Sequence, residues 1–143
     1  MILDTTYILP VAKIDIDTDL LTLIYDGKVP LSMDDVKISL ISLFELQANI
    51  SRKYKLPPAA SIDAIGVIRS TLKIEPFYNP GIIKAADTVS KYLPDYIDCL
   101  ILATAISLKE DLATEDTKIL GIRDRVRKEY GINLMSYKEV LNR

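Results

Sequence analysis

DCLILATAISL, residues Asp98–Leu108, is the stretch that decides the predicted fold. After Asp98 it carries no charge, and apolar side chains occupy nearly every side of the helix it would form, so the helix should be central and buried. A carboxylate at the mouth of a buried helix is costly unless a partner stabilises it. The nearest cations in the sequence are Lys91 and Lys109. Asp98 is therefore the first candidate functional residue.

Strand-like and helix-like segments alternate on both sides of this stretch. Strands are expected at Met1–Leu3, Val36–Ile41, Leu72–Pro76, Asp111–Thr114 and Ile132–Met135. Helices are expected at 17–25, 42–55, 61–70, 80–92, 94–109 and 117–130, with a last one opened by the capping-box sequence Ser136–Glu139. This alternation predicts a three-layer α/β/α sandwich with a mostly parallel central sheet. We expect a single domain over residues 1–143, with Pro57–Ala60 as a flexible loop.

Composition excludes several classes of function. The chain has 143 residues, of which 49% are hydrophobic and 27% charged, so it can bury a core. The absence of histidine excludes Ser-His-Asp triads and His-ligated zinc, and the single cysteine excludes an internal disulfide. The net charge of −2 does not indicate a nucleic-acid binder by bulk electrostatics. With no signal peptide and no apolar run of membrane-spanning length, a soluble cytoplasmic protein is expected.

Four acids fall at the junctions between predicted strands and helices. Asp4 follows the first strand, Glu45 lies near the start of the 42–55 helix, Asp98 near the start of its own, and Asp116 just after the strand that ends at Thr114. In a parallel sheet, the strand ends that lead into helices share one edge, and ligands bind outside that edge. We therefore expect the four carboxylates in one pocket, within reach of one or two metal ions.

Each acid also has a structural explanation. Ser42 and Glu45 have capping-box spacing, and for an isolated motif of this kind the cap is the more common role. Asp98 could complement a helix dipole, and Asp116 could be the N-cap of the next helix. Asp4 is harder to explain in this way, because no long helix is predicted directly after it.

Taken together, four segments resemble the PIN-domain family of metal-dependent ribonucleases: LDTTYIL around Asp4, ISLFELQ around Glu45, DYIDCLILATA around Asp98 and LATEDTKI around Asp116. Their order and placement carry the resemblance, which covers essentially the whole chain. The compact size is most similar to the VapC type of toxin from prokaryotic toxin–antitoxin pairs. The resemblance implies an RNA substrate and an antitoxin protein as a possible partner.

The resemblance also implies the metal site. Asp4, Glu45, Asp98 and Asp116 would be the catalytic acids and would bind Mg²⁺ or Mn²⁺. Oxygen-ligated Mg²⁺ can activate water and neutralise charge on a phosphodiester without histidine. Asp95 and Glu115 are extra acids, so the identity of the fourth ligand stays open, as does the number of metal ions.

Further residues are candidates for holding the substrate. Thr5 and Thr6 fall where the family has small hydroxyl residues beside the first acid, and Thr114 matches the threonine of its T-x-D motif. Arg52 lies seven residues after Glu45, two turns along a regular helix, and is the best candidate for a phosphate contact. Asn49, one turn after Glu45, could join the site or face solvent.

Other functions remain possible at this point. A receiver domain and a D-x-D phosphatase would both need a second acid near Asp4, where Thr5 and Thr6 stand. A non-catalytic PIN-like interaction module and a housekeeping nuclease stay open.

A homodimer is expected, from the resemblance and from apolar helix residues that so small a domain cannot all cover. These residues are Ile62, Ile65, Ile68, Ile82, Ile83 and Val89. The alternative is that they close the core of a monomer.

Overall fold

The computed structural model describes residues 1–143 and contains a central sheet of five parallel strands in the order β3-β2-β1-β4-β5. The strands are β1 (Ile2–Leu3), β2 (Lys37–Ser39), β3 (Lys73–Glu75), β4 (Leu112–Ala113) and β5 (Leu134–Met135). All five lie within the segments predicted as strands. Each strand has only two or three residues.

The central strand β1 is buried on both faces, as is typical of a parallel sheet between two helical layers. Ile2 belongs to one core cluster and Leu3 to the other, and neither is exposed to solvent. Ile2 aligns with Lys37 of β2 on one side and with Leu112 of β4 on the other. Alternating side chains of a two-residue strand therefore connect the two halves of the core.

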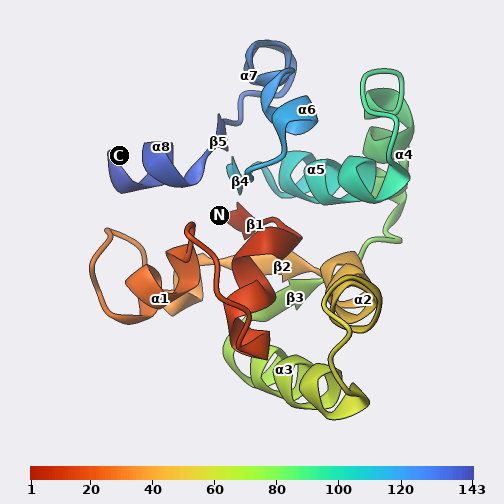
Figure 1. The fold of residues 1–143 in the computed structure, drawn as a ribbon. Helices are drawn as coiled ribbons and strands as arrows, with labels where there is room; N and C mark the ends of the chain where they lie inside the picture. The colour runs from red at the N-terminus through yellow and green to blue at the C-terminus, as the bar shows by residue number, and fades with distance from the viewer.

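Helices cover both faces of the sheet (Figure 1), so the predicted three-layer α/β/α sandwich is confirmed. The elements that contribute to the first core cluster are η1 (Thr5–Ala12), α1 (Leu20–Tyr25), η2 (Met33–Asp35), α2 (Leu40–Ala48), η3 (Asn49–Lys53), α3 (Pro58–Thr71) and α8 (Tyr137–Leu141). Those that contribute to the second are α4 (Pro80–Val89), α5 (Tyr96–Leu108), α6 (Thr117–Leu120) and α7 (Arg123–Tyr130).

Helix α5 is the buried central helix that its sequence predicts. Every residue from Cys99 to Ala105 is buried. Asp95 is the N-cap, because its side chain accepts a hydrogen bond of 2.8 Å from the backbone N–H of Ile97. Asp98 therefore lies in the first turn, where the buried part of the helix begins.

Three predictions of local structure are wrong. Pro57–Ala60 is not a flexible loop, because Pro58 begins α3 in the first-turn position that proline favours. The predicted 117–130 helix is divided into α6 and α7 at Gly121 and Ile122. The segment Thr5–Ala12 forms a 3-10 helix, which no amphipathic pattern in the sequence indicates.

None of the helices has the length and apolar character needed to cross a bilayer.

The strand order places a topological switch point between β1 and β4. From β1 the chain proceeds outward to β2 and β3, and later returns to β4 and proceeds to β5 on the other side. The segments that leave β1 and β4 consequently diverge, and open parallel sheets bind ligands in the crevice between such segments. Asp4 and Asp116 follow these two strands directly.

Candidate functional site

A polar pocket of about 240 Å³ lies at the carboxyl edge of the sheet, at this switch point. No apolar, lysine or arginine side chain lines it. Its lining residues are Asp4, Thr5, Thr6, Glu45, Asn49, Asp98, Glu115 and Asp116. We call it the acidic pocket. The four acids singled out from the sequence thus share one pocket, together with Glu115, Asn49 and two threonines.

Asp4 is fixed on both of its carboxylate oxygens. Its Oδ1 accepts the backbone N–H of Thr5 at 2.7 Å, which makes Asp4 the N-cap of η1. Its Oδ2 accepts the hydroxyl of Thr114 at 2.6 Å. The side chain is 7% exposed. Asp4 therefore has a structural role as a cap and also presents a pre-oriented carboxylate to the acidic pocket.

Thr114 connects the two central strand ends. Its hydroxyl donates to Asp4 and accepts the backbone N–H of Asp116 at 3.1 Å. The Asp116 carboxylate accepts the N–H groups of Lys118 and Ile119, so Asp116 is also the N-cap that its position predicts. Thr114 is fully buried beneath the pocket rather than on its wall. Its position suits orienting the acids more than direct contact with a ligand.

Glu45 is not part of a capping box, so that structural explanation of the residue is wrong. Helix α2 begins at Leu40, two residues earlier than predicted, with Ser39 rather than Ser42 as its N-cap, because the strand before it ends early. Glu45 lies in the second turn, and its carboxylate forms no hydrogen bond or ion pair within the chain. The Ser42 hydroxyl is instead buried without a hydrogen-bond partner. Nothing in the local structure of α2 requires an acid at position 45.

Asp98 has no stabilising partner. Its half-buried carboxylate forms no hydrogen bond or ion pair, and none of the ion pairs in the structure involves an acid of the pocket. Burial, followed by repulsion from Asp116, Asp95, Asp4 and Glu45, raises the pKa of Asp98 to about 7. Burial and the four surrounding carboxylates therefore both disfavour the ionised form.

Asp4 is shifted in the same direction, although its hydrogen bonds oppose the shift. Burial raises the pKa of Asp4 to about 6, with smaller contributions from the charges of Glu45 and Asp116. The hydrogen bonds from Thr114 and Thr5 favour the ionised form but do not offset the desolvation. Raised values on two acids of one pocket are a mark of a functional site when a specific charge cluster causes them.

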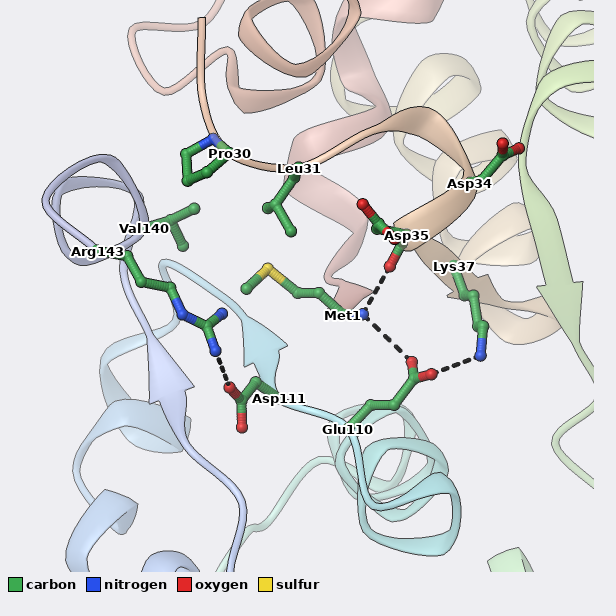
Figure 2. Close-up of a pocket in the computed structure, with 10 residues that line it drawn as sticks. All are labelled: Met1, Pro30, Leu31, Asp34, Asp35, Lys37, Glu110, Asp111, Val140 and Arg143. Atoms are coloured by element: carbon green, nitrogen blue, oxygen red, sulfur yellow. Dashed lines mark hydrogen bonds and ion pairs between the residues drawn. The ribbon is translucent and has the colours of Figure 1, made fainter. Parts of the chain in front are cut away.

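A larger pocket of about 760 Å³ at the opposite, amino-terminal edge of the sheet provides a contrast (Figure 2). Its charges are mostly matched within the chain. Lys37 pairs with Glu110, which also contacts the amino group of Met1, and Arg143 pairs with Asp111. Burial alone would raise the pKa of Glu110, but these cations lower it below its usual range. Cations of the chain thus pair with acids at that edge, whereas no cation lines the acidic pocket.

A divalent cation fits the chemistry of the acidic pocket. Carboxylate oxygens are the preferred ligands of Mg²⁺ and Mn²⁺. The Thr5 hydroxyl, on the wall of the pocket, is buried without a partner and adds one more oxygen. In the arrangement shown, no three of the acids come close enough to ligate a single ion. That the four acids reach one or two ions stays a prediction.

Two further positions complete the comparison with the sequence: Arg52, predicted as a phosphate contact, and Glu115, an extra acid whose place was left open. Arg52 does not line the pocket and is exposed, because residues 49–53 form a π-helical turn in which a seven-residue spacing is no longer two turns. Glu115 does line the pocket, and its carboxylate accepts the backbone N–H of Tyr137 at 3.0 Å. The only sequence signal for Glu115 was its place beside Asp116.

The comparisons with known proteins agree with this geometry. The family model described as "PIN domain" matches residues 1–124. A comparison with curated protein sequences gave no match.

Three solved structures have the same fold at low sequence identity. A toxin–antitoxin complex from Klebsiella pneumoniae is 22% identical, covers 92% of this chain and 93% of its own, and has a TM-score of 0.61. FitAcB from Neisseria gonorrhoeae is 19% identical, with coverages of 96% and 97% and a TM-score of 0.65. VapBC2 from Rickettsia felis, bound to a DNA fragment from their promoter, is 20% identical, with coverages of 94% and 96% and a TM-score of 0.63.

The family match spans most of the chain and includes all four acids of the predicted site, and the solved structures share its fold over nearly its whole length. The chain belongs to the PIN domain family.

Proposed function

We propose that the protein is a Mg²⁺- or Mn²⁺-dependent endoribonuclease that acts as the toxin of a toxin–antitoxin pair. The observation that carries the proposal is the acidic pocket, where carboxylates with no cation in reach meet at the switch point of a PIN fold. The family's general nuclease character supports hydrolysis of a phosphodiester.

Four carboxylates would hold the metal: Asp4, Glu45, Asp98 and Asp116. When bound, the metal would supply an activated water and neutralise charge on the phosphodiester. Thr114 keeps Asp4 oriented through its hydroxyl. The capping bonds made by Asp4 and Asp116 fix these two side chains before any ligand arrives.

Substrate contacts are proposed at the rim of the acidic pocket. Thr5, Thr6 and Asn49 line its wall and can donate hydrogen bonds to phosphate or ribose oxygens. Arg52, exposed four residues beyond the end of α2, would contact the RNA strand outside the pocket.

The toxin role is proposed from the solved structures, one of which is a toxin–antitoxin complex. An antitoxin protein is accordingly the proposed regulatory partner, and the cytoplasm, where RNA is accessible, is the proposed location.

A homodimer is also proposed. Of the apolar helix residues considered from the sequence, Ile68, Ile82 and Val89 are buried in the core, whereas Ile62 is 70% and Ile83 46% exposed. Each of these exposed isoleucines lies on an outer helical layer, where a second copy of the chain could cover it.

We predict that Asp98→Asn abolishes metal-dependent RNA cleavage while the chain stays folded. The amide keeps the size of the side chain but removes the charge that would bind the metal, so single-turnover cleavage of labelled RNA should fall by at least ~100-fold. The matched control is Asp87→Asn, which removes an exposed acid from α4 and should cleave like the wild type. Normal cleavage by Asp98→Asn would place the catalytic acids elsewhere.

We predict that Asp98→Asn stabilises the metal-free protein, and more so as the pH rises. The pKa of Asp98 is raised to about 7 in the folded state, so the wild type binds more protons when folded and loses stability as the pH rises from about 4 to 7. In a chelating buffer the variant should melt a few degrees higher at pH 8 and at the same temperature as the wild type at pH 4. A variant that is less stable at every pH would instead indicate a structural role for Asp98.

We predict that sedimentation of the wild type at micromolar concentration gives the mass of two chains. If the contact uses α3, Ile62→Lys should give a single-chain mass; if it uses α4, Ile83→Lys should do so, because a buried lysine at the interface is costly. A single-chain mass for the wild type at all concentrations would contradict the dimer.

A further inference from the structure

A second pocket adjoins the acidic pocket and is larger, at about 470 Å³. Both pockets include Thr6 and Glu115 in their walls, so they are neighbours. The second is completed by the loop of residues 16–18 and by the start of α8. Its full lining is Thr6, Ile16, Asp17, Thr18, Glu115, Ser136, Tyr137 and Lys138. We call it the adjoining pocket.

Its lining differs in chemistry from that of the acidic pocket. Ile16 and the ring of Tyr137 are half-buried and offer apolar and aromatic surface. The hydroxyls of Thr18 and Ser136 are present beside them. Lys138 is exposed and forms no ion pair. These are the groups on which proteins stack bases, bind 2′-hydroxyls and neutralise phosphates of single-stranded RNA.

Glu115 fixes the border between the two pockets. Its carboxylate accepts the N–H of Tyr137, so the start of α8 is tied to the loop that carries Asp116. Tyr7, under this border, has a buried hydroxyl without a partner, and burial together with the charges of Glu115 and Asp4 raises its pKa. A hydrogen bond between distant segments thus holds the border, with the buried Tyr7 side chain beneath it.

Three arginines of the C-terminal part are engaged elsewhere. Arg123 pairs with Glu139, Arg125 lies on the ring of Tyr92 and pairs with Glu129, and Arg127 bonds Asn133. Lys138 is the free cation on the walls of these two pockets. A strand whose phosphate reaches the acidic pocket needs such a cation next to it, because five carboxylates would otherwise repel it.

We propose that the adjoining pocket binds the RNA nucleotide next to the scissile phosphate, with its base against Tyr137 and Ile16 and its outer phosphate near Lys138. The proposal rests on the proposed ribonuclease function, which it deepens by assigning a substrate subsite. Single-stranded RNA fits best, because only an unpaired base can leave its stack to enter a pocket.

The test is RNA binding by Lys138→Gln, measured by fluorescence anisotropy with a short labelled RNA of randomised sequence. Asp98→Asn is present in every protein so that the RNA is not cleaved. Lys138→Gln should weaken binding about three- to tenfold, and the slope of log K against log salt should shrink by about 0.7, as expected for one lost phosphate contact on a single strand. The control, Lys84→Gln on the outer side of α4, should change neither quantity.

A second readout does not depend on affinity. RNA that contains 4-thiouridine should cross-link, on irradiation, to residues 16–18 or 136–138. An unchanged salt slope for Lys138→Gln, with cross-links only outside these two segments, would overturn the subsite. In that case cleavage by the protein with Asp98 intact would show that the ribonuclease function stands without it. A protein that neither binds nor cleaves RNA would overturn the proposed function and the subsite together.

Discussion

Electrostatic repulsion among carboxylates at the switch point is the constraint on which the rest of this structure depends. Asp4 and Asp116 lie after the adjacent strands β1 and β4. Glu45 lies on α2 and Asp98 on α5, the helices on the two faces of the sheet. The chain provides no cation to balance them. At the other edge of the same sheet, Glu110 is paired with Lys37 and the terminal amino group, and Asp111 is paired with Arg143. The protein can pair charges within its fold, and it leaves the acidic pocket unpaired.

Two of the four acids also have a structural role in the fold. Asp4 and Asp116 cap η1 and α6, and Thr114 joins them through one hydroxyl. These bonds oppose the desolvation of Asp4 but do not cancel it. In the proposed function these two carboxylates would cap a helix and also bind the metal, so the structural and the catalytic roles are not alternatives.

Much of the architecture could be predicted from the sequence because patterns within short segments determine it. The uncharged run after Asp98 predicts the buried α5, and the alternation of short apolar strands with helices predicts the parallel sandwich. The ends of the helices and strands were harder to predict from the sequence. Helix α2 begins at Leu40 because β2 ends at Ser39, and the π-helical turn near Arg52 breaks the regular helical spacing. No local sequence pattern indicates either feature. Glu115 and the adjoining pocket depend on contacts between distant segments, which spacing alone does not reveal.

The most direct measurement is calorimetric titration of Mn²⁺ into the metal-free wild type and into Glu45→Gln. Glu45 forms no hydrogen bond or ion pair in the chain, so its amide variant changes the charge of the acidic pocket with little effect on folding. Our account predicts saturable Mn²⁺ binding to the wild type, strongly weakened in Glu45→Gln and retained in Asp34→Asn, which removes an acid from the opposite edge of the sheet. Equal Mn²⁺ binding by the wild type and Glu45→Gln would contradict it.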